Sequence, residues 1–218
     1  EGLGVFKVAA SRSRDAFEEL MGRSPPGVVT SDRYSAYSHL PADRRQACWA
    51  HLRRDFQAMI DRGDAGKAIG EDLLMNSDVM FDAWSRVRAG TASRRTFATR
   101  TLPWLRREVR TLLERGVACG VEKTAATCRE VLKVEPSLWT FAKVEGVGPT
   151  NNAAERALRH AVCWRKTSFG TDSPRGSRFV DRILTAVESC RRQSRDPLGF
   201  LVEAIQARRS GGKPPSLI

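Results

Sequence analysis

The sequence has few of the residues that build disulfide frameworks and zinc centres. Its 218 residues include five cysteines and three histidines, and the cysteines are scattered without paired metal-ligand spacing. An odd, scattered set of thiols excludes a secreted disulfide scaffold and indicates reduced cysteines. The sequence also has no apolar run long enough to span a bilayer, so we expect a cytoplasmic protein without a membrane partner.

Acidic residues are the second shortage. The chain has 25 Asp and Glu against 37 Lys and Arg, which gives a formal net charge of +12 at pH 7. A positive excess of this size favours a polyanionic partner such as nucleic acid. Hydrophobic residues make up 41% of the chain, enough to bury a core, and we expect one main domain with an insertion.

The first part of the chain, residues 1–61, alternates strand-like and helix-like segments. Its strand-like apolar runs are residues 3–9, 28–30 and 46–50. This alternation is typical of proteins that pack helices on a sheet. It predicts an α/β fold.

The rest of the chain has helical patterns. Residues 62–142 repeat apolar side chains at helical spacing with little alternation, which predicts an all-helical insertion. Residues 143–209 continue with helices, and Asp196 with Pro197 is a typical cap and first turn. We expect residues 210–218 to form a flexible tail.

Two acids occupy positions suited to metal chemistry. Asp32 follows a strand-like run, and Glu155 lies on the opening turn of a helix that begins near Asn152. Carboxylates held on rigid elements among cations are typical of a Mg²⁺ site that acts on a phosphodiester. Simpler roles stay open, because Glu155 can close a capping box with Asn152 and Asp32 can cap a helix near Ser35.

Basic side chains accompany both acids along the sequence. Such a bias is unnecessary for a solvated helix face, whereas a site for the DNA backbone requires it. Arg53 and Arg54 are equally compatible with a solvated face. The candidate DNA-binding residues are Asn151, Asn152, Arg156, Arg159, Arg165, Lys166, Arg53 and Arg54.

Cys48 and His51 have the Cys-x-x-His spacing of half a zinc site. Zinc requires four ligands, or three and a water, and no second pair follows at finger-like spacing. We therefore expect no zinc.

Three stretches of the sequence together resemble the catalytic domain of insertion sequence 66 family transposases. They are Val29–Tyr37, Cys48–Phe56 and Thr150–Arg159. Their order and spacing carry the resemblance, and the double-Asn stretch is the most specific of them. The resemblance continues to the Asp196-Pro197 helix and so covers nearly the whole chain.

The resemblance implies an RNase H-like core, which is a mixed sheet flanked by helices, interrupted by the helical insertion. It implies an Asp-Asp-Glu triad in which Asp32 is the second Asp and Glu155 the Glu, both catalytic and both ligands of Mg²⁺ or Mn²⁺. Cys48 and His51 match a signature at the entry to the insertion, where we expect a positional role.

The implied activity is metal-dependent cleavage at transposon ends and strand transfer into target DNA. The expected partners are transposon-end DNA, target DNA and further copies of the chain, which would assemble on paired transposon ends. The expected location is the nucleoid in the bacterial cytoplasm.

The first Asp of the triad would lie on an opening strand upstream of Leu3, and no residue here matches it. We therefore expect that strand to be missing and this chain alone to be inactive in strand cleavage. The alternative is a catalytically inactive DNA-binding remnant of a transposase, which predicts salt-sensitive DNA binding whatever the metal.

Overall fold

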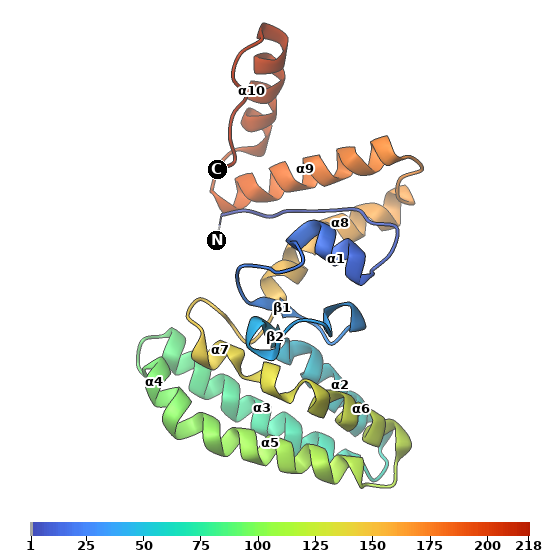
Figure 1. The fold of residues 1–218 in the computed structure, drawn as a ribbon, viewed down its shortest axis with the longest axis vertical. Helices are drawn as coiled ribbons and strands as arrows, with labels where there is room; N and C mark the ends of the chain where they lie inside the picture. Colours follow the sequence, from blue (N-terminus) through green and yellow to red (C-terminus); the bar gives the residue numbers. More distant parts are fainter. Residues whose placement is uncertain (1) are drawn as a thin grey trace. The chain divides into compact units, whose positions relative to one another are not determined.

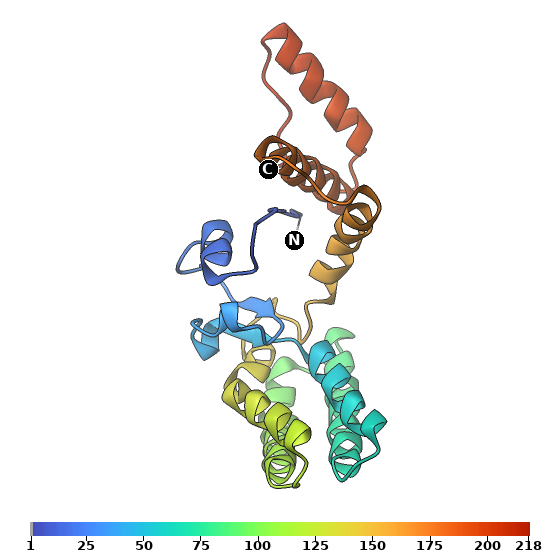
Figure 2. The same cartoon turned by 90° about the vertical axis from the view of Figure 1, so that its right-hand side faces the viewer.

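The computed structural model describes residues 2–218, and the chain divides into two compact units (Figures 1 and 2). Unit 1 combines Glu1–Leu20 with Ala153–Ile218, and unit 2 is the continuous segment Met21–Asn152. Of the chain, 66% is helical. No helix within residues 2–218 is long and apolar enough to cross a membrane. The division into three regions and a tail that we expected from the sequence stays a prediction.

Unit 2 consists mainly of helices. The long ones are α2 (Trp49–Arg62), α3 (Lys67–Arg88), α5 (Leu102–Val117) and α6 (Glu122–Lys133). Helix α3 packs against α2 and α5, and α5 packs against α6. Shorter segments complete the unit: η1 (Ser35–Tyr37), η2 (Ala42–Arg44), α4 (Arg94–Thr96), the π-helix η3 (Phe97–Thr101), η4 (Glu135–Leu138) and α7 (Thr140–Lys143).

The buried apolar cluster follows the helical spacing expected from the sequence. On α3 it includes Ile69, Leu73 and Trp84, and on α5 it includes Leu105 and Leu113. Burying each large apolar side chain contributes roughly 1.5–3 kcal/mol. The predicted helical character of this part of the chain is confirmed.

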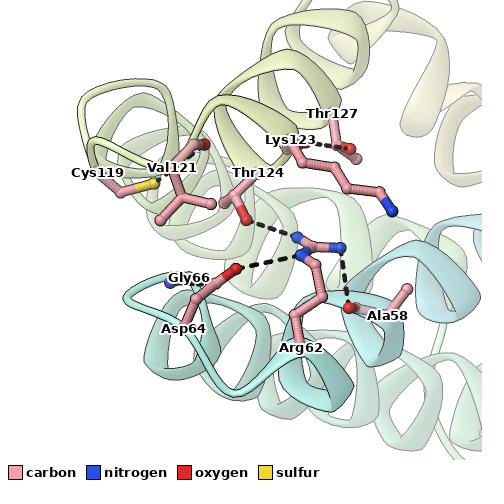
Figure 3. Close-up of polar contacts among 9 residues, drawn as sticks. All are labelled: Ala58, Arg62, Asp64, Gly66, Cys119, Val121, Lys123, Thr124 and Thr127. Carbon is pink, nitrogen blue, oxygen red and sulfur yellow. Dashed lines mark hydrogen bonds and ion pairs between the residues drawn. The ribbon is translucent and has the colours of Figure 1, made fainter.

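Arg62 joins the end of α2 to the start of α6 (Figure 3). Its guanidinium donates to the carbonyl of Ala58 at 2.9 Å and to Thr124 Oγ1 at 2.6 Å. Asp64 accepts from Arg62 at 3.4 Å and from the N–H of Gly66 at 2.7 Å. A Cβ on Gly66 would lie 2.4 Å from Thr124 Oγ1, so the turn between α2 and α3 requires glycine there.

The described residues contain one sheet of two short parallel strands. Strand β1 (Val29–Ser31) pairs with β2 (Arg45–Ala47), and the register places Val29 opposite Arg45. Helix α2 begins two residues after β2, within the run expected to be a third strand. The predicted α/β fold with an RNase H-like mixed sheet is therefore wrong, because the structure is largely helical.

Unit 1 contains three long helices, which are α8 (Asn152–Ser168), α9 (Pro174–Arg192) and α10 (Pro197–Ser210). A shorter helix, α1 (Arg14–Met21), lies near the start of the chain. Asp196 caps α10, because its carboxylate accepts from the N–H groups of Leu198 at 3.1 Å and Gly199 at 2.8 Å. The predicted cap is confirmed.

The expected strand at residues 3–9 is an extended segment that has a helix as its partner. The N–H groups of alternate residues donate to side chains of α9 that are four residues apart. These bonds join Gly4 to Ser189, Phe6 to Thr185 and Val8 to Asp181. A strand needs the backbone of a neighbouring strand as its partner. Because side chains of a helix take that place, the segment is extended without forming a sheet.

Candidate functional site

Asp32 lies directly after β1, at the carboxyl end of that strand. Its Oδ1 accepts from the N–H of Tyr34 at 3.0 Å, and its backbone carbonyl accepts from Arg45 Nη2 at 2.9 Å. Tyr34 is the N-cap position of η1, which has no side-chain cap. The bond from Tyr34 therefore closes a turn around the half-buried carboxylate, directly before η1.

A cavity of about 730 Å³ lies beside Asp32 within unit 2. Its volume is in the range of ligand sites in other proteins. The residues that line it come from η1, η2, β2, α2, α6 and their connections. Its ionisable lining residues include Asp32, Arg33, Arg45, His51, Arg54, Asp55, Glu130 and Lys133.

Two of the cations in this cavity form ion pairs with acids of the same cavity. Arg33 forms an ion pair with Asp55. Lys133 pairs with Glu130 at 2.5 Å, and this hydrogen bond lowers the pKa of the Glu130 carboxyl. Each of these two positive charges therefore already has an acidic partner.

Arg45 is the buried cation of the cavity, with 3% of its surface exposed. Burial lowers the pKa of its guanidinium, and the negative charge of Asp32 opposes that shift. Its Nε is buried and has no hydrogen-bond partner. The sequence gives no sign of this role, because it depends on a strand pairing that places Arg45 opposite Val29 and on a side chain that reaches the carbonyl of Asp32.

Cys48 is the point where the three sequence stretches meet. Its N–H donates to the carbonyl of Ser31 at 2.8 Å, and its Sγ accepts from the N–H of Asn151 at 3.4 Å. The next residue, Trp49, donates its N–H to the carbonyl of Pro149 at 3.0 Å. These bonds tie the end of β1, the start of α2 and the segment before α8 to one another within unit 2.

The metal-ligand types of the described chain are dispersed. Within residues 2–218, no three or more His, Cys, Asp or Glu residues form a group that could hold a metal ion. Mg²⁺ commonly keeps several waters and takes one or two carboxylates together with substrate phosphates. Asp32, a carboxylate on the wall of a cavity, fits a site of that kind.

Arg53 and Arg54 extend from α2 toward a second cavity of unit 2, of about 780 Å³. Arg53 is occupied within the protein, because it donates to Ser77 Oγ and, at 2.5 Å, to Asp78. Arg54 is exposed and lines both cavities. Asn152, at the start of α8, also lines the second cavity.

Asn151 lies just before α8 in unit 2, and the predicted DNA-binding cations that remain lie on α8 in unit 1. Glu155 occupies the first turn of that helix and is half-buried. The exposed cations of α8 are Arg156, Arg159, Arg165 and Lys166. A third cavity, of about 330 Å³, lies in unit 1, where Arg156 and His160 of α8 line it together with Arg191 of α9. The sequence did not single out Arg191.

Comparison with known proteins gives a family match. A family model described as "Transposase IS66 family" matches residues 2–178. Uncharacterized protein y4qI of Sinorhizobium fredii is 27% identical over 212 residues, covering 88% of this chain and 38% of that protein. Uncharacterized protein y4hP of the same organism is 25% identical over 205 residues, covering 82% and 36%. The chain thus spans less than two fifths of each relative. No solved structure matches it with statistical significance.

Proposed function

Since the chain belongs to the IS66 family of transposases, we propose that it binds DNA and takes part in cutting the phosphodiester backbone with a divalent metal ion. Cleavage at transposon ends and strand transfer into target DNA are the activities we propose for the complete reaction. The proposal extends to assembly of several copies on paired DNA ends.

One observation carries this proposal. Within unit 2, Ser31, Cys48 and Asn151 are joined by hydrogen bonds, and Asp32 follows directly after Ser31 on the wall of the 730 Å³ cavity. Three stretches that are far apart in the sequence therefore meet at Cys48, which is bonded to the residue before Asp32. This arrangement supports the proposed site at Asp32.

In this proposal the residues of the chain have separate roles in binding the metal ion and the DNA. Asp32 would hold Mg²⁺, and Glu155 is the second ligand proposed from the sequence. When bound, Mg²⁺ supplies Lewis-acid stabilisation of phosphoryl oxygens. The exposed cations Arg54, Arg159 and Lys166 would hold the DNA strand by its phosphates.

Salt-dependent DNA binding tests the proposed partner. We expect fluorescence anisotropy with a labelled oligonucleotide to give an affinity that falls linearly with the logarithm of salt concentration. Arg159→Gln and Arg165→Gln on α8 should each weaken binding and reduce the salt slope by about 1. Arg208→Gln on α10, exposed and outside the predicted site, is the matched control. Binding that is insensitive to salt would contradict the proposal.

Paramagnetic broadening by Mn²⁺ tests the proposed metal ligand without requiring cleavage. We expect dilute Mn²⁺ to broaden amide NMR signals around Asp32. Asp32→Asn keeps an oxygen to accept from Tyr34 and removes the charge, so the broadening should be lost. Asp43→Asn, in η2 and not on the cavity wall, is the control. Equal broadening in all three proteins would remove Asp32 from the metal site.

A further inference from the structure

Arg45 lines the cavity as a buried cation with an incomplete set of partners. A guanidinium carries five N–H donors. Within the described residues, the guanidinium of Arg45 makes one hydrogen bond, from Nη2 to the backbone carbonyl of Asp32, which is an uncharged acceptor. Its Nε has no partner, and only 3% of its surface is exposed. Buried charges in proteins are normally paired, because desolvating an unpaired charge is costly.

Among the acids of the cavity, Asp32 offsets only part of the effect of burial on Arg45, because the pKa of the guanidinium stays lowered. Asp55 is taken by Arg33, and Glu130 is taken by Lys133. The lining contains four Lys or Arg residues and three Asp or Glu residues, so the former exceed the latter by one. Arg54 is one of these four cations, and it is exposed. The cavity is therefore suited to an anion from outside the protein.

The size and chemistry of the cavity indicate which anion this is. Its volume of about 730 Å³ exceeds the needs of a small inorganic ion and accommodates a phosphate with an attached sugar. The planar guanidinium matches the tetrahedral oxygens of a phosphate better than a spherical halide.

We propose that Arg45 anchors a phosphate-binding site in this cavity, and that the ligand is one phosphodiester group of a DNA strand. This assignment rests on the proposed function, because it names the group that receives the DNA backbone. Arg54 contributes a second positive charge to the same ligand. Neither the family match nor the relatives assign a role to Arg45.

NMR of the arginine side chains tests the site directly. We expect the Nε–H signal of Arg45 to shift and saturate as inorganic phosphate is added, and to stay in place when chloride is added at the same ionic strength. Arg45→Lys keeps a positive charge and loses the planar donor set, so phosphate affinity should fall at least tenfold. Arg129→Lys, on the exposed face of α6 in an ion pair with Glu122, is the matched control.

Two results would overturn the phosphate site. One is an Arg45 signal that does not respond to phosphate in the unsubstituted protein, and this result does not depend on whether the variant folds. The other is an unchanged phosphate affinity in Arg45→Lys when its backbone amide spectrum matches that of the parent.

A competition experiment separates this inference from the proposed function. If the labelled oligonucleotide binds with the expected salt slope but neither Arg45→Lys nor added phosphate weakens it, the proposed function stands and the Arg45 site is overturned. If phosphate binds at Arg45 but no DNA binding is found, DNA is overturned as the ligand. Loss of both ligands in Arg45→Lys, with binding kept in Arg129→Lys, supports the inference.

Discussion

Glu135 is a charged side chain held in the interior of unit 2. It is 3% exposed and accepts from Arg106 Nε at 2.7 Å, from Arg106 Nη2 at 2.8 Å and from Trp139 Nε1 at 2.8 Å. Glu135→Gln removes the charge and replaces an acceptor with a donor. We expect the free energy of unfolding to fall by about 1–3 kcal/mol. The partial exposure of Arg106 keeps the electrostatic part of that loss small.

Urea denaturation measures this effect against a matched control. Glu114 pairs with Arg110 at 3.1 Å on the surface of α5, where both side chains are 58% exposed. Glu114→Gln should change the unfolding free energy by no more than about 0.5 kcal/mol. Equal losses for the two variants would mean that the buried pair contributes no more than the exposed one.

Cys128 makes stability depend on pH in the alkaline range. Burial raises the pKa of its thiol from 9.0 to about 11. Because the folded state holds the proton more tightly, this stabilisation is complete below about pH 9 and is lost as pH rises to about 11.

The stability advantage of the parent over Cys128→Ala should shrink across that window, by at most about 3 kcal/mol. Chemical denaturation at a series of pH values measures it. The exposed Cys163→Ala is the control, and a pH-independent advantage at Cys128 would contradict the shift.

Single residues also show how far the sequence predicts the candidate site. The position of Asp32 at a strand end was predictable, because the apolar run before it is local information. The cavity-lining role of Arg45 was not, because it depends on which residue of β2 lies beside β1. The intramolecular ion pair of Arg53 likewise joins two helices that the sequence does not orient.

Among the elements, α5 and α6 are in close contact at Gly116. A Cβ on Gly116 would lie 2.3 Å from Cys128 Sγ. We expect Gly116→Ala to lower the unfolding free energy by about 1–3 kcal/mol, although alanine is the better helix former. Adding Cys128→Ala makes room for the new methyl group, so the double variant should be more stable than the two single losses predict.

Gly70 provides the contrasting case between α2 and α3. A Cβ there would lie 2.7 Å from the backbone carbonyl of Phe56, which no side-chain truncation can remove. Gly70→Ala should therefore stay destabilised in combination with Cys128→Ala. Thermal unfolding of the parent, the three single variants and the two double variants completes the comparison. Additive losses for Gly116 and Cys128 would show that the two helices separate easily.

The elements were predictable in proportion to how local their stabilisation is. The helical spacing of apolar residues was sufficient to predict α3 and α5, because a helix satisfies its own backbone groups and buries one face. The prediction of a strand at residues 3–9 was wrong, because a strand-like apolar pattern does not identify which element the extended segment will bond to. The RNase H-like sheet failed for the same reason, since its strands would have needed partners that local patterns do not specify.

At the scale of the whole molecule, the apolar core lies in one unit. Every residue of the main buried cluster falls between Ala47 and Ala142, inside unit 2. We therefore expect the fragment Met21–Asn152 to fold on its own, with a cooperative thermal transition and dispersed amide NMR signals. Leu105→Ala in that fragment should lower the unfolding free energy by about 2–5 kcal/mol. A fragment without a cooperative transition would show that unit 2 needs the rest of the chain.

The pairing of residues 2–8 with α9 has a consequence for synthesis. Gly4 and Ser189 are separated by 185 positions, and Phe6 and Thr185 by 179. At about 5–20 residues per second, roughly 10–40 s pass between translation of the two partners. The whole of unit 2 is translated within that interval. The alternate apolar side chains of the early segment must meanwhile stay soluble on the ribosome, which gives chaperones a defined period in which to bind them.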